Sequence, residues 1–204
     1  MYVPRFNAMQ DAEQIRELVR TVGSAELVTV GDDGYPIASL LPVIWAGERL
    51  IFHMARANQQ WTTIGAGSRA LAIVTGAQAY ISPSWYPSKA EHGRAVPTWN
   101  YSAVHFTGPV QTHQDADWLL DAVTHLTDLH ELHRERPWSV ADAPERYIDK
   151  QLRAIVGIEM TIERVEAKAK LSQNRSEEDR RGVIDGLRRE GGRRERELSD
   201  SMDA

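Results

Sequence analysis

Apolar and polar residues alternate along this chain with two different periods, and the change of period separates helices from strands. An amphipathic helix is predicted over residues 11–22, because apolar side chains recur at i, i+3, i+4 and i+7 from Ile15 and Gly23 follows as a stop signal. A second long helix is predicted over 115–131, and a capped one over 176–189, starting at Ser176. Shorter helices are expected over 58–64 and 147–152.

The remaining periodic segments repeat every two residues, which is typical of β-strands. They are residues 26–30, 35–47, 49–55, 70–75, 78–81, 102–112 and 154–165. Short links with Asp and Gly turns join them, and long helical crossovers between most of them are missing. An antiparallel barrel is therefore favoured over a doubly wound sheet. In the last strand, Ile155 and Met160 are expected to face inward and Glu159 outward.

The end of the chain has a different composition. Beyond Gly191 nearly every residue is charged, and Leu198 and Met202 are the apolar exceptions. We therefore expect one domain over 1–190 and a solvated, disordered tail over 191–204.

Composition excludes several classes of function. The 204 residues include no cysteine, which rules out disulfides, Cys-ligated zinc, iron–sulfur clusters and a thiolate nucleophile. A net charge of -5, with no basic stripe and no helix-turn-helix pattern, makes direct DNA binding doubtful. There is no run of eighteen apolar residues, so no membrane span is expected, and the protein is interpreted as cytoplasmic.

Familiar catalytic and metal-binding patterns are missing as well. The chain has no phosphate loop, no GxGxxG, no GxSxG and no HExxH. His125, His130 and His133 share a predicted helix, but their spacing favours exposed histidines over metal ligands, so no metal is expected.

An aromatic stretch over 79–101, AYISPSWYPSKAEHGRAVPTWNY, carries far more ring surface than a link between strands needs. Large rings left in water invite association, so something should cover Trp85 and Trp99. A planar ligand and a partner subunit both remain open. For either ring, packing in the core is an equally good interpretation.

Two polar junctions add possible ligand contacts. Residues 53–58, HMARAN, leave a strand and enter a short helix with Arg56 and Asn58 at the junction, which suits a phosphate group. The alternative is an arginine paired with a surface carboxylate. Residues 170–175, KLSQNR, are dense in hydrogen-bond donors, and the alternative there is an ordinary polar turn. Together with the aromatic stretch, these junctions supply the contacts that flavin mononucleotide (FMN) requires.

Five separated motifs resemble the PaiB family of FMN-binding negative transcriptional regulators. They are MYVPRF (1–6), HMARANQQW (53–61), AYISPSWY (79–86), VPTWNY (96–101) and KLSQN (170–174). Gln59 departs from the family, which usually has proline there. The resemblance implies a split β-barrel of the FMN-binding type with flanking helices, in the α+β class and mainly β, and a homodimer with FMN at the subunit interface.

Site residues and function follow from the same resemblance. It implies FMN-binding roles for Ser39, Leu40, Arg56, Asn58, Trp61, Ser82, Ser84, Trp85, Thr98, Trp99, Asn100, Lys170, Gln173 and Arg175. Repression through metabolite or redox sensing is the expected function. The alternative is an FMN-dependent oxidoreductase, a flavin reductase or small-molecule oxidase. No catalytic acid or base stands out, so no catalytic residue is assigned.

Overall fold

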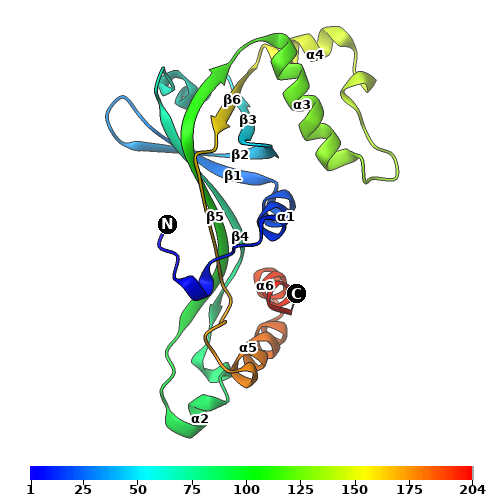
Figure 1. Ribbon diagram of the computed structural model, residues 1–204. Helices are drawn as coiled ribbons and strands as arrows, with labels where there is room; N and C mark the ends of the chain where they lie inside the picture. The colour runs from blue at the N-terminus through cyan, green and yellow to red at the C-terminus, as the bar shows by residue number, and fades with distance from the viewer. Residues whose placement is uncertain (204) are drawn as a thin grey trace. The chain divides into compact units, whose positions relative to one another are not determined.

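A computed structural model describes residues 1–203 of the chain (Figure 1). The strands are β1 (Ser24–Val30), β2 (Pro36–Ala46), β3 (Arg49–Ala55), β4 (Arg69–Ile81), β5 (Thr98–His113), β6 (Ile155–Thr161) and β7 (Arg164–Lys170). The α-helices are α1 (Ala12–Val22), α2 (Ser88–His92), α3 (Ala116–Glu131), α4 (Glu145–Leu152), α5 (Glu177–Glu190) and α6 (Arg193–Asp203). Four 3-10 turns complete the list: η1 (Arg5–Asn7), η2 (Gln59–Thr63), η3 (Pro83–Trp85) and η4 (Val140–Asp142). Among these described residues, no helix is long and apolar enough to cross a membrane.

The strands form one seven-stranded sheet in the order β4-β1-β2-β3-β6-β5-β7, and β4 also pairs with β5. This extra pairing closes the sheet on itself, and the pairings of β1–β2, β2–β3, β3–β6 and β5–β6 are antiparallel. A closed antiparallel sheet with helices outside it confirms the α+β fold class and the barrel that the strand pattern predicted.

The chain divides into two compact units. The larger unit contains residues 16–74 and 105–165, and the smaller contains residues 1–15, 75–104 and the chain from Glu166 onward. In the larger unit, buried side chains alternate with more exposed ones along β1 and β3, whereas β6 is buried at every residue from Val156 to Met160. The buried face includes Leu27, Leu50, Phe52, Ile158 and Met160, each at most 2% exposed.

The smaller unit is built around α5, which packs against the aromatic stretch. Its buried cluster contains Ala79, Ile81, Tyr86, Val183, Ile184, Leu187, Leu198 and Met202. Trp85 lies directly on α5, where a Cβ added to Gly186 would stand 2.3 Å from the indole ring. A Cβ at Gly182 would stand 2.2 Å from the Trp85 carbonyl oxygen. These two glycines let η3 approach the helix backbone.

Residues 193–203, where we expected a solvated, disordered tail, form the helix α6, which packs beside α5. Leu198 and Met202 are four residues apart and therefore lie on one helix face. They are 0% and 1% exposed. Two apolar residues on one face dock this highly charged segment, although its composition resembles that of a solvated chain. Ala204, the last residue of the expected tail, lies outside the described residues.

Two strand predictions also change. Residues 70–75 and 78–81 belong to one continuous strand, β4, and residues 154–165 are divided between two strands, β6 and β7.

Glu159, expected to face solvent, is 7% exposed. Its carboxylate accepts hydrogen bonds from Arg49 at 3.0 Å and from Gln111 at 3.1 Å. These two partners offset the cost of burying the charge.

Candidate functional site

The junction between β3 and η2 brings four of the predicted site residues together in the larger unit. Asn58 is the N-cap of η2, where its side chain accepts from the Gln60 N–H at 3.0 Å, and its Nδ2 donates to Ser39 Oγ at 2.8 Å. The Trp61 indole N–H donates to the Arg56 carbonyl at 2.9 Å. Two hydrogen-bonded pairs, Asn58 with Ser39 and Trp61 with Arg56, therefore lie at this junction, and we call the four residues the junction cluster.

Arg56 carries a positive charge that its own hydrogen bonds leave unneutralised. Its Nε donates to the Arg153 carbonyl at 2.9 Å, Nη1 to Gln114 Oε1 at 2.7 Å, and Nη2 to the Ile155 carbonyl at 3.2 Å. All three acceptors are neutral, and a guanidinium has five N–H donors, so two have no acceptor given within residues 1–203. The alternative interpretation of the sequence was that Arg56 pairs with a surface carboxylate, and none of these three bonds goes to a carboxylate.

The helix expected to strengthen this site is shorter than its pattern indicated. η2 is a five-residue 3-10 turn, and Asn58 already occupies its Gln60 N–H. A helix macrodipole needs several aligned turns, so η2 adds little field at the junction. The case for an anion here rests on the Arg56 guanidinium.

Ser39 and Leu40 lie on a half-free edge of the sheet. Residues 36–42 of β2 pair with β1, but the pairing with β3 begins only at Val43. Gln60, which is 1% exposed, donates from Nε2 to the Leu27 carbonyl of β1 at 2.9 Å and to the Ile37 carbonyl of β2 at 3.1 Å. Its Oε1 is buried without a partner in the described structure. Gln60 was not among the predicted site residues. Its position two residues after the cap residue Asn58 is a signal that could have identified it.

A second group of predicted site residues lies in the smaller unit. Lys170 donates from Nζ to the Trp99 carbonyl at 2.8 Å and to Thr98 Oγ1. Burial lowers the pKa of the Lys170 ammonium from its ordinary value. Lys168 lies two residues earlier on the same strand and is 7% exposed. Its Nζ is 5.0 Å from the centre of the Tyr101 ring, where a cation–π contact forms.

Asn100 and Ser172 meet in the interior of the smaller unit. Asn100 Nδ2 donates to Ser172 Oγ at 2.9 Å, and Asn100 is fully buried. Its Oδ1 has no hydrogen-bond partner among the described residues. Ser172 has a backbone φ of 63°, which is uncommon and strained for a residue other than glycine. Ser172 was not among the predicted site residues, although it lies inside the KLSQN motif.

The remaining predicted residues have clear structural partners. Ser82 caps η3 by accepting from the Ser84 N–H at 3.2 Å. Gln173 Oε1 accepts from the Leu171 N–H at 2.7 Å, and the Arg175 guanidinium lies 4.7 Å from the centre of the Tyr86 ring. Trp85 packs on α5, as described above, whereas Trp99 is 41% exposed and bonds Gln78 Oε1 at 3.1 Å. Of the two tryptophans, Trp99 has the ring face free to meet a ligand.

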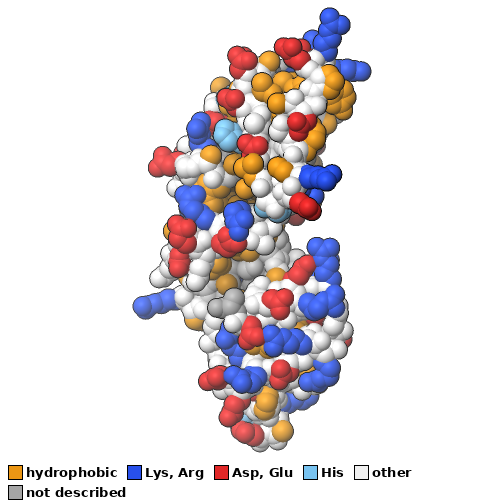
Figure 2. All heavy atoms as spheres, turned by 90° about the vertical axis from the view of Figure 1, so that its right-hand side faces the viewer, with side chains coloured by type: hydrophobic (Ala, Val, Ile, Leu, Met, Phe, Trp, Pro, Cys, Tyr) orange, Lys and Arg blue, Asp and Glu red, His pale blue; other side chains and the backbone are white. Residues whose placement is uncertain are grey.

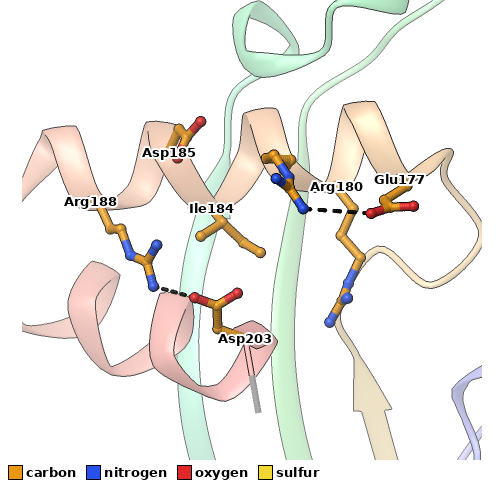
Figure 3. A pocket seen from close by; sticks show the side chains of 7 residues that line it. Glu177, Arg180, Ile184, Asp185, Arg188 and Asp203 are labelled. Atoms are coloured by element: carbon orange, nitrogen blue, oxygen red, sulfur yellow. Dashed lines mark hydrogen bonds and ion pairs between the residues drawn. The ribbon is translucent and has the colours of Figure 1, made fainter.

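A pocket of about 300 Å³ between α5 and α6 is a less suitable anion site (Figure 3). Its charged lining consists of Arg180, Arg181, Arg188, Glu177, Asp185 and Asp203. Figure 3 shows Arg188 of α5 reaching Asp203 of α6 in an ion pair that joins the two helices. Three carboxylates balance three guanidinium groups, so the pocket has no net charge to attract a phosphate.

The residues present fit FMN. The phosphate of FMN needs cations without anionic partners, and the hydrogen bonds described for Arg56 and Lys170 all go to neutral oxygens. The pyrimidine edge of the flavin needs hydrogen-bonding groups, and the buried Asn100 Oδ1 is an acceptor without a partner. The exposed ring of Trp99 suits a planar partner.

Comparison with known proteins agrees with this chemistry. A family model described as "Putative FMN-binding domain" matches residues 1–164. The Bacillus subtilis protein "Protease synthase and sporulation protein PAI 2" is 32% identical over 207 aligned residues, covering 100% of this chain and 97% of that protein. An uncharacterized Aspergillus fumigatus protein is 34% identical over 152 residues, covering 67% of this chain and 58% of its own.

Two solved structures share the fold. The conserved hypothetical protein Rv2991 from Mycobacterium tuberculosis has a TM-score of 0.62 at 11% identity, covering 86% of this chain and 94% of its own. The flavocytochrome Anf3 from Azotobacter vinelandii has a TM-score of 0.61 at 16% identity, covering 87% and 77%. At these identities the likeness concerns the fold alone, and it agrees with the split barrel expected from the sequence. FMN is the cofactor, and the chain belongs to the PaiB family of FMN-binding proteins.

Proposed function

We propose that this protein is an FMN-dependent negative regulator of transcription that responds to a metabolite or to redox state. The observation that carries the proposal is the full-length similarity to the B. subtilis protein, whose name connects it with protease synthesis and sporulation. Because 100% of this chain is covered, the similarity includes the smaller unit and the C-terminal helices as well as the barrel.

The junction cluster is the proposed phosphate site. Arg56 supplies the charge and two free N–H donors, Asn58 and Ser39 hold the turn, and Trp61 fixes the backbone at Arg56 through its indole. The exposed edge at Ser39 and Leu40 offers backbone groups to the flavin ring. FMN bound there supplies an electron acceptor whose spectrum reports its surroundings.

The second group of residues is proposed to complete a flavin site within a homodimer. Lys170 supplies a further cation, while Thr98, Trp99 and Asn100 supply hydrogen-bonding groups and a ring face. Ser82, Ser84, Trp85, Gln173 and Arg175 hold the surrounding turns, so their effect on FMN affinity is expected to be smaller than that of Lys170.

An apolar sheet face supports the homodimer. Val28 of β1 is paired with Ala38 of β2 and with Leu71 of β4, and these side chains point away from the buried Leu27. On the same two strands, Val30 is 60% exposed and Leu40 is 67% exposed. Apart from Glu26, which pairs with Leu40, this face is apolar, and such a face is typical of a surface that a second subunit covers.

Regulation is proposed to be indirect, without operator binding by this chain. The arginines of α5 and α6 are the densest basic segment, but carboxylates on the same two helices engage them. Arg181 pairs with Glu177 at 3.5 Å, Arg193 pairs with Glu197 at 2.7 Å, and Arg188 pairs with Asp203. Figure 2 shows basic and acidic side chains interspersed over the lower part of the face that it presents. Such mixed surfaces bind DNA phosphates weakly.

One set of measurements on the purified full-length protein tests this function. FMN-loaded protein should absorb near 450 nm, fail to shift promoter DNA at physiological salt, and alter transcription in cells when the gene is deleted. A specific shift would contradict indirect regulation. Bleaching of the flavin by NADH or NADPH, followed by turnover with an acceptor, would establish the alternative, an FMN-dependent oxidoreductase.

A further inference from the structure

A groove on the outside of the larger unit lies between α3, α4 and η4, apart from every residue assigned to FMN. Its volume is about 750 Å³, which is within the range of small-molecule sites. The floor is apolar, formed by Leu120, Val140, Ile148 and Leu152 with neighbouring alanines. Leu120 is 37% exposed, so the floor is open to a ligand.

Four carboxylates line the same groove. They are Asp117 and Asp121 on α3, and Glu145 and Asp149 on α4, while no lysine or arginine is among the lining residues. Among residues 1–203, no ion pair given by the structure uses any of the four. In the upper part of Figure 2, where the side that carries these helices faces the viewer, apolar side chains gather with acidic ones around them.

The placement of these carboxylates destabilises the two helices slightly through repulsion between like charges. Asp117 and Asp121 are four residues apart on one helix, and Glu145 and Asp149 are four apart on the other, so each pair repels by a few tenths of a kcal/mol. The first member of each pair lies in a first helical turn, where an acid stabilises the helix dipole. Asp121 and Asp149 have no such benefit. A cation in the groove would remove the repulsion.

The chemistry of the groove distinguishes an organic cation from a metal ion. Within the described part of the chain, no group of three or more acidic, histidine or cysteine residues is placed to hold a metal. The four carboxylates therefore do not converge on one point, and they share the groove lining with apolar side chains. We propose that this groove binds an organic ammonium ion with an apolar body, its alkyl or aryl part on Leu120 and Ile148 and its charge between Asp121 and Asp149.

Three size-matched probes test the proposal on the full-length, FMN-loaded protein. 4-Phenylbutylamine carries the positive charge, 4-phenylbutan-1-ol is neutral, and 4-phenylbutanoate is negative. Isothermal titration calorimetry at low salt should show the highest affinity for the amine, a lower one for the alcohol and the lowest for the carboxylate. The affinity for the amine should fall as the salt concentration increases. Equal affinities for the amine and the alcohol, or no binding of the amine at millimolar concentration, would overturn the proposal.

Matched variants test which carboxylates of the groove hold the amine. Asp121→Asn and Asp149→Asn keep the shape of each side chain, and each should weaken binding of the amine by about fivefold, the upper range for an exposed ion pair. Asp128→Asn makes the same change on α3 outside the groove lining and should leave the affinity unchanged. An equal loss in Asp128→Asn, or no loss in the double variant, would contradict the assignment. The affinity for the amine should also be the same at low and high protein concentration; a loss of affinity as the protein associates would show that a second copy covers the groove, which would also contradict the assignment.

Discussion

The indole of Trp118 on α3 lies over Gly157 on β6, so closely that a Cβ on this glycine would stand 2.0 Å from the ring. The same indole stacks on His113 with ring centres 4.1 Å apart and planes 3° apart. One side chain therefore docks α3 onto the sheet through a glycine on one strand and a histidine on the next.

Gly157→Ala should loosen that contact. The added methyl group must push the indole away, and such overpacking costs about 1–3 kcal/mol of the free energy of unfolding. For a chain of this length the melting temperature should fall by about 2–4 °C per kcal/mol. Gly65→Ala is the control, since a Cβ at Gly65 meets nothing within 4 Å. Equal melting temperatures for the two variants would show that Trp118 is free to move.

Arg56→Ala should weaken FMN binding by about 1.5–3 kcal/mol, or roughly 10- to 150-fold, because a hydrogen bond to a charged group is lost. Fluorescence titration with FMN measures the loss. Gln114→Ala is a control, because it removes the side-chain partner of Arg56 but keeps the guanidinium charge. If Gln114→Ala weakens FMN binding as much as Arg56→Ala does, the loss comes from disturbing the hydrogen bonds around Arg56 and not from removing its charge. An unchanged affinity in Arg56→Ala would exclude it from the phosphate site.

The stability of the fold should fall in mildly acidic solution because of His53. Burial lowers the pKa of this imidazole below its ordinary value of 6.5. As the pH falls through 6.5, the unfolded chain takes up a proton that the folded chain does not, so the free energy of unfolding decreases until the lower folded pKa is passed. Urea unfolding at several pH values measures the slope. His53→Gln should flatten the slope, whereas the exposed His133→Gln should not.

Leu198→Ala should destabilise the smaller unit by about 2–5 kcal/mol, the range for truncating a fully buried leucine. Arg194→Ala, at an exposed residue in the first turn of the same helix, should change the free energy of unfolding by at most about 0.5 kcal/mol. Urea unfolding followed by circular dichroism compares the two. A disordered C-terminus would make both substitutions equally harmless.

Val30→Asp should dissociate the proposed homodimer, because it places a charge on the apolar face of β1 and β2, at the end where Val30 pairs with Pro36. Light scattering coupled to gel filtration gives the mass of the species in solution. Val96→Asp is the matched control, since Val96 is 68% exposed and lies outside that face. A wild-type monomer, or a dimer that tolerates Val30→Asp, would disprove this interface.

Local patterns predicted most of the fold because they depend on neighbours in the sequence. Asn58 and Ser176 were recognisable as caps from adjacent residues, and both accept the expected backbone N–H. The partners of Arg56 were not predictable, since Arg153 and Ile155 lie 97 and 99 residues away. Glu159 was misplaced for the same reason, because Arg49 and Gln111 come from other strands.

Helix α6 was missed through a different weakness of sequence patterns. Its charge content dominates the composition, whereas two side chains on one face decide whether it docks. A count of charges cannot detect that, but the four-residue spacing of Leu198 and Met202 does contain the information.

Because the chain has no cysteine, methionine is its main sulfur target for peroxide. Met202 is 1% exposed, and its sulfur lies 3.8 Å from the Asn100 amide nitrogen. Oxidant reaches that sulfur when α6 lifts from the smaller unit. The rate at which Met202 becomes a sulfoxide, followed by mass spectrometry, is therefore a built-in measure of how often the C-terminal helix opens.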